Sequence, residues 1–345
     1  MRFSLFAHME RTDNSVSHPE LYAHFLELCE MADRGGLDAI WVGEHHGMDF
    51  TIAPNPFSQL CDLANRTSRV RLGTSTVVAP FWHPVKLVGE ASMVDIITSG
   101  RLDICLSRGA YEFEYERLSP GLDAWVAGEK LREMVPALQA MWAGDYAHEG
   151  KHWQFPATTS IPKPVQRPHP PLWIAARDPN THDFAVKHGC NLQVTPLWQG
   201  DEEVANLMAR FEAAVSDNPD LPRPEIMVLR HTFVGADEGE VLRAAEDLSD
   251  WYCTFGSWFK NDLPVTNGSM PPLTAGERAA IDMFSPDNMR KNHIVGTPDQ
   301  VIERIRSYEA MGYDEFSIWL DNGMNHHKKR KTLRLFIDEV LPEFS

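Results

Sequence analysis

The stretch from residue 39 to residue 47, AIWVGEHHG, carries the side chains best suited to chemistry. It begins with the apolar, strand-like run Ala39–Val42 and continues into Glu44, His45 and His46. Histidine has an ordinary pKa near neutrality, so it can carry protons at physiological pH. A buried strand that ends in acid and base side chains is the unit from which (β/α)8 barrels build active sites. A single histidine at a strand end is more often structural. Whether a histidine of this stretch is catalytic must therefore be judged from the residues at the other strand ends.

Two further strand ends carry residues that could hold a phosphate. Arg108 offers a bidentate fork to a phosphate, and Gly109 beside it lets the backbone approach closely. Residues 178–181 open a predicted helix, whose free N–H groups and Thr181 hydroxyl could contact the same phosphate from a second side. The alternatives are a surface salt bridge at Arg108 and an ordinary helix cap at Asp178.

A metal site at residues 44–46 is not expected. Neighbouring side chains in an extended segment point to opposite sides, so Glu44, His45 and His46 cannot chelate one ion together.

Charge and composition exclude several classes of partner. The formal net charge is −17, with 49 acidic and 32 basic residues, which argues against nucleic acid or an anionic membrane as the main partner. The five cysteines form no C-x-x-C pattern and indicate free thiols in a reducing compartment. The N-terminus does not resemble a signal peptide, and no apolar run approaches the roughly 18 to 20 residues that span a bilayer. We therefore expect a cytoplasmic protein.

Strand-like and helical segments alternate along the whole chain. The expected strands are Arg2–Ala7, Ala39–Val42, Val70–Val78, Leu102–Leu106, Leu172–Ala175, Asn191–Val194, Ile226–Val234 and Glu315–Leu320. Successive strand–helix units require a parallel sheet with right-handed crossovers, and eight of them predict a closed (β/α)8 barrel of the TIM type. The alternative is an open doubly wound sheet, but no G-x-G-x-x-G turn follows any strand.

The expected helices fill the intervals between these strands. They cover Pro19–Arg34, Pro56–Thr67, Pro84–Gly100, Asp123–Trp142, Asn180–His188, Asp201–Val215, Glu238–Phe259, Pro298–Gly312 and His326–Val340. A small hairpin is expected at Tyr146–Phe155. Residues 261–285 are rich in proline and glycine and lack apolar periodicity, which predicts a mobile insertion that closes the barrel mouth as a lid. We interpret residues 1–345 as a single barrel domain with this insertion.

Several of these segments carry a family resemblance. They are GLDAIWVGEHH at 36–46, RVRLGTSTVVAPFWHPVKL at 69–87, SGRLDICLSRGAYEFEY at 99–115, PLWIAARDPNTHDFAVKHG at 171–189 and IVGTPDQVIERI at 294–305. Together they span nearly the whole chain, and the chain resembles the bacterial-luciferase-like family of flavin-dependent monooxygenases.

The resemblance implies a chemistry and an assembly. It implies that the barrel binds reduced FMN at the strand ends. It further implies that the flavin reacts there with O2 to give a C4a-(hydro)peroxide that oxygenates a small organic substrate. It also implies a separate NAD(P)H:flavin reductase that supplies the reduced flavin, and a homodimer or dimer of dimers. The sequence selects no particular substrate.

The resemblance also assigns residues. His45 matches the family's active-site histidine and Arg108 its phosphate arginine. Ser75–Thr76 falls where many members have a non-prolyl cis peptide beneath the flavin ring. Ser107 replaces the reactive cysteine of the luciferase catalytic subunit, so that residue's role is not carried over. Asp178 departs from the small residues usual beside the phosphate, and its carboxylate would repel a phosphate unless Arg177 neutralises it.

An oxygenating flavin needs a site that excludes water. Phe6, Trp41, Phe81 and Trp82 are the aromatic residues expected to form that apolar wall. Two alternatives remain: a relative that uses the deazaflavin F420 as a hydride carrier, and a non-catalytic partner like the luciferase accessory subunit. The EHH and SRG motifs favour an FMN-dependent monooxygenase over an F420-dependent relative. The presence of both His45 and Arg108 argues against the non-catalytic accessory subunit.

Overall fold

A closed parallel barrel lies at the centre of the computed structural model, which describes residues 1–260 and 264–344. Within these residues eight strands pair in the order β1-β2-β3-β5-β8-β9-β10-β12, and β12 returns to β1. Their bounds are β1 Arg2–Phe6, β2 Ala39–Val42, β3 Arg71–Thr74, β5 Leu102–Ser107, β8 Leu172–Ala175, β9 Asn191–Val194, β10 Ile226–Val234 and β12 Glu315–Trp319. Every barrel pair is parallel, so all strand C-termini meet at one mouth. The predicted TIM-type barrel is confirmed.

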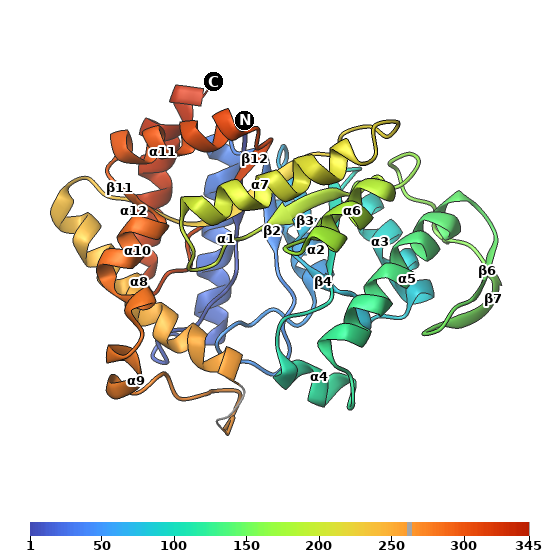
Figure 1. Ribbon diagram of the computed structural model, residues 1–345, viewed down its shortest axis with the longest axis horizontal. Helices are drawn as coiled ribbons and strands as arrows, with labels where there is room; N and C mark the ends of the chain where they lie inside the picture. Colours follow the sequence, from blue (N-terminus) through green and yellow to red (C-terminus); the bar gives the residue numbers. More distant parts are fainter. Residues whose placement is uncertain (261–263, 345) are drawn as a thin grey trace.

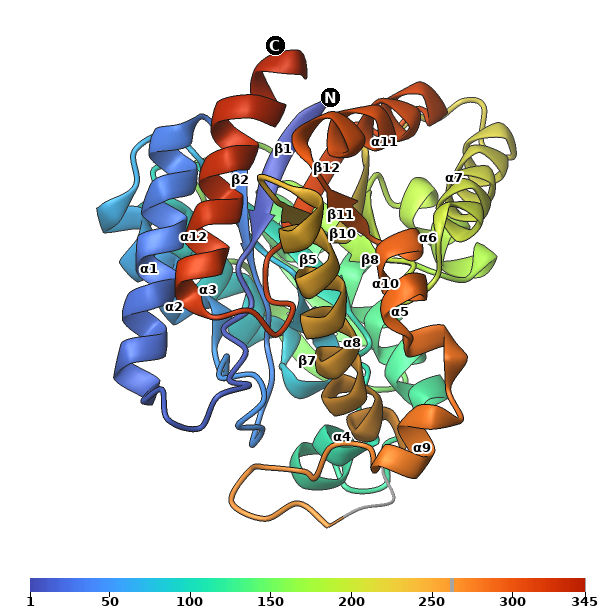
Figure 2. The ribbon, with the colours of Figure 1, turned by 90° about the vertical axis from the view of Figure 1, so that its left-hand side faces the viewer.

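Helices surround this barrel (Figures 1 and 2). The longer ones are α1 His18–Gly35, α2 Pro56–Arg66, α3 Pro84–Ile97, α5 Ala124–Ala143, α6 Pro179–Lys187, α7 Asp201–Ser216, α8 Glu238–Lys260, α11 Pro298–Met311 and α12 His326–Leu335. Their starts follow local chemistry, because the side chains of Ser17, Asn55, Asp123 and Asn325 each accept a backbone N–H of the first helical turn. None of the described helices is both long enough and apolar enough to cross a membrane.

Several short elements differ from the expectation. The strand expected at Val70–Val78 is divided into β3 and β4 (Val77–Val78). The three-residue strand β11 (Ile294–Gly296) and the helices α4 (Glu112–Leu118) and α10 (Pro286–Asn292) were not expected. Their few residues give no sustained hydrophobic period, so tertiary contacts decide them. The expected hairpin is present as β6 (Tyr146–Glu149) and β7 (Gln154–Thr158).

The predicted lid at 261–285 is only partly described, since residues 261–263 lie outside the described residues. The rest includes helix α9 (Ala275–Ala279), and Met270, Leu273 and Phe284 are buried. The carbonyl of Gly268 accepts the backbone N–H of Asp49 at 2.6 Å, so this segment contacts the loop after β2. Figure 2 shows it beside α4, at the lower end of α8. Its role as a lid stays a prediction.

Two apolar clusters stabilise the fold. One fills the space between the barrel and its helices and includes Leu72, Ile104 and Ile318. The other fills the barrel interior and continues beneath α8, and Trp41 and Trp251 belong to it. This second cluster makes the floor and one wall of the mouth where the candidate site lies.

Candidate active site

Glu44 organises the loop that follows β2. Its carboxylate is 2% exposed and accepts the backbone N–H of Val78 at 2.7 Å and the indole N–H of Trp82 at 2.9 Å. It also bonds His46 Nε2 at 2.8 Å, and this hydrogen bond raises the pKa of His46. His46 is therefore held by Glu44, and the side chain left for chemistry is that of His45.

His45 lies at the mouth with a side chain that is 17% exposed. Its Nδ1 is 3.3 Å from Glu114 Oε2, and its ring contacts those of His8 and Tyr111 with centroids 5.1 and 5.3 Å away. A hydrogen bond from Nδ1 to a carboxylate leaves Nε2 as a proton acceptor.

Helix α4 joins two strand ends. Glu114 is 1% exposed and, besides contacting His45, accepts the backbone N–H of His46 at 2.7 Å. Its neighbour Tyr115 donates its hydroxyl to the carbonyls of Arg108 at 2.8 Å and Gly109 at 3.1 Å. The short helix therefore fixes the loop after β2 against the loop after β5. Sequence reasoning missed this helix, although residues 112–115 of it lie within the matched segment 99–115.

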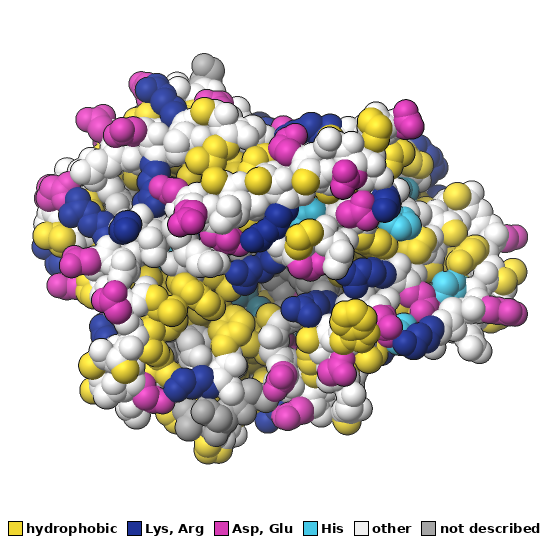
Figure 3. Space-filling view, in the orientation of Figure 1, with side chains coloured by type: hydrophobic (Ala, Val, Ile, Leu, Met, Phe, Trp, Pro, Cys, Tyr) yellow, Lys and Arg dark blue, Asp and Glu magenta, His cyan; other side chains and the backbone are white. Residues whose placement is uncertain are grey.

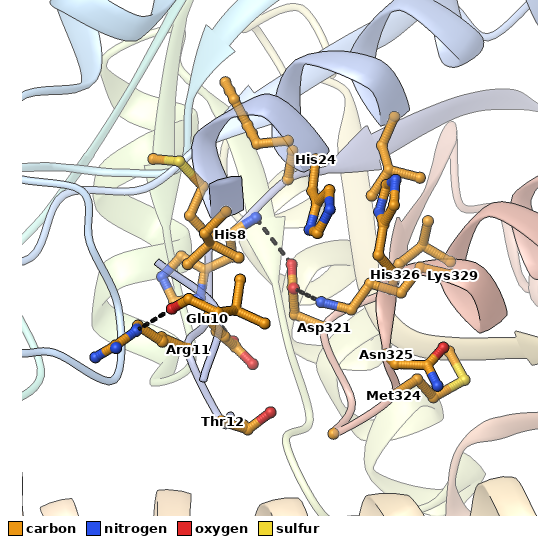
Figure 4. Close-up of a pocket in the computed structure, with 18 of the residues that line it drawn as sticks. His8, Glu10, Arg11, Thr12, His24, Asp321, Met324, Asn325, His326 and Lys329 are labelled. Atoms are coloured by element: carbon orange, nitrogen blue, oxygen red, sulfur yellow. Dashed lines mark hydrogen bonds and ion pairs between the residues drawn. The ribbon is translucent and has the colours of Figure 1, made fainter. Parts of the chain in front are cut away.

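A neutral acid–base pair lies behind His45. His8 Nδ1 bonds Glu10 Oε1 at 2.8 Å, and both side chains are buried. Burial lowers the pKa of His8 well below its ordinary value and raises the pKa of Glu10 well above it. Glu10 also accepts the indole N–H groups of Trp251 and Trp319. The backbone N–H of His8 donates to Asp321, which pairs with Lys329 beside a cavity of about 180 Å³ (Figure 4).

The expected cis peptide is present between Ser75 and Thr76. The Ser75 hydroxyl donates to Gln193 Oε1 at 2.7 Å, and the hydroxyls of Thr76 and Ser107 are 2.5 Å apart. These contacts bring the ends of β3, β5 and β9 together at the mouth, so Ser75, Thr76 and Ser107 share one site.

Arginines gather at the next part of the rim. Arg108 is exposed and donates to the carbonyl of Ala124 at 3.2 Å. Burial lowers the pKa of Arg177, the nearby carboxylate of Glu203 acts in the opposite direction, and the charges of Arg210 and Arg108 lower it further. Figure 3 shows Lys and Arg side chains around a central hollow in the surface, with apolar side chains on its left. A cationic edge of this kind suits a phosphate.

Asp178 acts as an ordinary helix cap. Its Oδ1 accepts the backbone N–H of Thr181 at 3.0 Å, and its Oδ2 accepts the Thr181 hydroxyl at 2.6 Å. These hydrogen bonds lower the pKa of Asp178 against the effect of burial. The two Thr181 donors expected for phosphate are therefore already occupied by this carboxylate.

The four aromatic residues expected in the apolar wall do not come together. Phe6 and Trp41 belong to the barrel interior, where the Trp41 N–H donates to Glu315 at 2.8 Å. Trp82 belongs to the cluster outside the barrel and packs edge-on against Phe57 of α2, with Phe81 beside that cluster. Phe6 stacks on His8 at 4.8 Å, and His8 in turn contacts His45, whereas Phe81 contacts the ring of His46 at 5.6 Å.

Residues 148–152 have the sequence HEGKH, which matches the H-E-x-x-H pattern of zinc-binding helices. The prediction that no metal site exists did not consider this match. Here the pattern lies in the β6–β7 hairpin, and His148 and His152 hydrogen-bond Glu133 and Glu129 of α5. No group of three ligating side chains suited to a metal ion occurs among the described residues.

A closed parallel barrel with acid–base and cationic side chains at the C-terminal mouth is the architecture of a barrel enzyme. The family model of luciferase-like monooxygenases matches residues 1–315, and the chain belongs to this family. It is a flavin-dependent monooxygenase. The oxygenase component of flavin-dependent trigonelline monooxygenase from Acinetobacter baylyi is 56% identical over 345 residues, covering 100% of this chain and 96% of that protein.

Solved structures share the fold. Monooxygenase RslO1 from Streptomyces bottropensis superposes with a TM-score of 0.82 at 25% identity, covering 100% of both chains. An F420-dependent secondary alcohol dehydrogenase gives 0.78 at 17% identity and covers 100% of this chain and 99% of that one. The oxygenating constituent of 3,6-diketocamphane monooxygenase from Pseudomonas putida, in complex with FMN, has a TM-score of 0.76 at 18% identity. The match covers 99% of this chain and 98% of that one. Fold alone therefore does not separate FMN from F420.

Proposed function

We propose that the chain is the oxygenase component of a two-component system. It takes reduced FMN from a separate NAD(P)H:flavin reductase and uses O2 to oxygenate a small organic substrate. The observation that carries this proposal is that α4 holds both His45 and the Arg108 loop at one mouth. A proton carrier and a phosphate-binding cation are the two groups that an FMN oxygenase requires at that place.

The residues present fit FMN. Arg108 and Arg177 would hold the phosphate, since both lie on the cationic rim and neither is neutralised by an ion pair among the described residues. The Ser75–Thr76 peptide and the Ser107 hydroxyl would lie against the ring system. Reduced flavin, when bound, supplies the electrons that activate O2. In this site His45 Nε2 accepts or donates the proton, Glu114 orients its ring, and Phe6 and Tyr111 exclude water.

The substrate proposed for this chain is trigonelline, a pyridinium ring that carries an N-methyl group and a carboxylate. The support is the relative in Acinetobacter baylyi, which is 56% identical over the whole chain and is named for that substrate. Identity at this level across the full length favours a shared substrate more strongly than fold does.

The direct test supplies chemically reduced FMN to the purified chain with O2 and trigonelline. We expect consumption of trigonelline, an oxygenated product that contains one atom from ¹⁸O2, and no turnover when reduced F420 replaces FMN. Oxidation of reduced FMN to FMN, with reduction of O2 to hydrogen peroxide and no oxygenated product for every substrate tried, would support the accessory-subunit alternative. Turnover with reduced F420 alone would show a hydride-transfer enzyme and refute the proposal.

A further inference from the structure

His8 turns its ring into the barrel mouth. Side chains alternate along this end of the first strand, so that Leu5 and Ala7 belong to the cluster outside the barrel, whereas Phe6 belongs to the interior cluster. His8 continues the interior set, and its ring stacks on that of Phe6 with the centroids 4.8 Å apart. The ring also meets that of His45 edge to face at 5.1 Å. Two imidazoles from neighbouring strand ends therefore share the candidate active site.

The two nitrogens of the His8 ring have different surroundings. Nδ1 is 2.8 Å from Glu10 Oε1, whereas Nε2 makes no hydrogen bond with any of the described residues. The edge with Nε2 faces Gly43, because a Cβ at that position would be 3.1 Å from Nε2 and 3.5 Å from the carbonyl oxygen of Ser75. This carbonyl belongs to the Ser75–Thr76 cis peptide, against which the flavin ring system is proposed to lie. Nε2 is therefore the His8 nitrogen on the side of that ring system.

Glu10 holds this imidazole from behind. It is 4% exposed and accepts the indole N–H groups of Trp251 and Trp319. Burial is the main cause that raises the pKa of Glu10 well above its ordinary value, and the charge of Asp321 adds to it. Lys329 and the two indoles act in the opposite direction but do not outweigh burial. Glu10 is therefore a neutral carboxylic acid at rest.

This neutral acid assigns the tautomer of His8. Burial lowers the pKa of His8 well below its ordinary value, so the imidazole is also neutral and carries one hydrogen. The other partners of Glu10 are indole donors, so His8 Nδ1 is the acceptor left for the Glu10 hydroxyl within the described residues. The ring hydrogen is then on Nε2. His45 is the opposite case, because its Nδ1 donates to the Glu114 carboxylate and its Nε2 is an acceptor.

Glu10 also lines the cavity of about 180 Å³ between α1 and α12 (Figure 4). This volume suits about six water molecules at roughly 30 Å³ each. The wall offers polar partners for them: the ion pair of Asp321 with Lys329, and Nδ1 of His326, which is buried and has no partner among the described residues. Water in this cavity, the charge of Lys329 and the two indole N–H groups would all stabilise a carboxylate on Glu10. These groups lower the cost of ionising Glu10 during a reaction.

Oxygenation of a substrate needs an acid as well as a base. Reduced FMN supplies two electrons and two hydrogens, and the substrate supplies two electrons to its new bond with oxygen. The O–O bond breaks, one oxygen atom enters the product and the other leaves as water. Two protons must therefore leave the ring system, and two must reach the departing oxygen. A site that excludes bulk water has to move them with its own side chains.

We propose that His8 is a proton donor of this site, beside His45 as the proton acceptor. His8 Nε2 gives its hydrogen to the departing oxygen, and the Glu10 hydroxyl passes its proton to Nδ1, so the ring stays neutral and Glu10 becomes a carboxylate. His45 Nε2 takes up, one after the other, the two protons that the ring system releases, and gives the first to the departing oxygen and the second to solvent. When the product leaves, solvent at the mouth returns a proton to His8 Nε2, and Nδ1 gives its own back to Glu10. This inference rests on the proposed function and assigns the acid of its site.

The tautomers can be read directly in the full chain without flavin. Nitrogen NMR of protein labelled with ¹⁵N-histidine distinguishes Nδ1–H from Nε2–H, and His8→Phe and His45→Ala identify the two signals by their loss. We expect the hydrogen on Nε2 in His8 and on Nδ1 in His45. Glu10→Gln should keep the His8 tautomer, because its amide N–H can donate to Nδ1 as the hydroxyl does. A hydrogen on Nδ1 of His8 in the wild type would overturn the proposal.

Glu10→Gln then separates a proton donor from a structural hydrogen bond, since an amide holds Nδ1 but has no proton to give. In single turnover with supplied reduced FMN, we expect Glu10→Gln and His8→Phe each to lower the rate of product formation about 10²-fold. FMN affinity, measured by fluorescence titration, should keep the wild-type value in both. His24→Gln, on the wall of the same cavity, is the control and should keep the wild-type rate. If His8→Phe does not fold, Glu10→Gln decides, because it retains the shape of the carboxyl group.

The outcomes separate this inference from the proposed function. A wild-type rate of product formation in Glu10→Gln, or in folded His8→Phe, would overturn the inference and leave the proposed function standing. FMN binding that weakens in step with the loss of product would show that the pair only shapes the site, and would also overturn the inference. A wild-type chain that forms no product from reduced FMN, O2 and trigonelline would refute the proposed function and this inference with it.

Discussion

At the scale of single residues, the adjacent histidines 45 and 46 have different surroundings. His46 is bonded to Glu44, which is itself fixed by Val78 and Trp82, whereas His45 contacts Glu114 and faces the mouth. Adjacent side chains in an extended loop point apart, so only one of the two can reach a ligand at the mouth. We therefore expect His46 to be structural and His45 to be the one that acts on a ligand.

Replacement of His45 by alanine should lower product formation by about 10² to 10⁴, the usual contribution of general acid–base catalysis. FMN binding should persist, because the arginines proposed to hold the phosphate lie elsewhere on the rim. The measurement is the ratio of product to peroxide in stopped-flow turnover with supplied reduced FMN. His46→Ala is the matched comparison. A collapsed ratio in His46→Ala together with an intact ratio in His45→Ala would reverse the assignment.

Arg108→Ala should weaken FMN binding by about 1.5 to 3 kcal/mol, the range for a hydrogen bond to a charged group. Riboflavin lacks the phosphate, so its affinity should change little. Fluorescence titration of both ligands tests this, with Arg243→Ala on the exposed face of α8 as control. Equal weakening of FMN and riboflavin would show that Arg108 does not contact the phosphate.

His293 should make stability depend on pH. Burial holds its folded-state pKa well below the ordinary value, whereas the unfolded chain takes up a proton near pH 6.5. Its contribution to stability is therefore complete above about pH 6.5 and is lost as pH falls below it, by about 1.4 kcal/mol at one unit below. Buried carboxyl groups such as Glu10 change the unfolding free energy in the opposite direction as pH falls. The contribution of His293 must therefore be isolated by comparing wild type with a variant that lacks this histidine.

The measurement is urea unfolding of wild type and His293→Gln at pH 7.5 and 5.5. Relative to wild type, the variant should become more stable by about 1.4 kcal/mol on acidification. His327→Gln changes an exposed histidine on α12 and should leave the wild-type difference unchanged. A variant whose pH dependence equals that of wild type would show that His293 is protonated in the folded protein.

At the scale of elements, α4 links the two halves of the site although it has only seven residues. Tyr115→Phe removes the donor to the carbonyls of Arg108 and Gly109, at a cost of about 1 kcal/mol, the worth of a typical hydrogen bond. We expect FMN affinity to fall about three- to ten-fold while the unfolding midpoint changes little. Tyr146→Phe in the distant hairpin should leave FMN affinity unchanged. An unchanged FMN affinity in Tyr115→Phe would show that α4 does not position the loop that carries Arg108.

At the scale of the whole molecule, α3 presents an apolar face to solvent. Met93 is 46% exposed, and Ile96 and Ile97 are each 41% exposed. Ile161 and Val165 of the connector after the hairpin are also exposed and lie beside α3, near Gly89 and Gly100. A patch of this kind is typical of an association surface. We propose that the homodimer implied by the family resemblance forms through α2 and α3.

Light scattering at micromolar concentration should give the mass of a dimer or a dimer of dimers. Ile97→Asp should shift the protein toward the monomer, because a buried unpaired carboxylate is costly at an apolar interface. Leu242→Asp changes another exposed apolar position, on α8, and should leave the mass unchanged. A wild-type monomer would contradict this assembly.

The sequence by itself determined the barrel and the location of two of its candidate site residues. Alternating apolar runs and capped helices set the order of strands, and barrel closure then placed the residues after β2 and β5 at one mouth. That is why His45 and Arg108 could be singled out before any coordinates: their location follows from the position of a strand end along the chain.

Only the tertiary structure decided how these residues are paired. Glu114 reaches His45 across 69 positions of the chain, and Trp251 reaches Glu10 across 241. No local pattern encodes such contacts, and the raised pKa of Glu10 is visible only once its burial is known. The local sequence pattern determines at which strand or helix end a residue lies. The protonation state and the partners of its side chain depend on the groups that the folded chain packs around it.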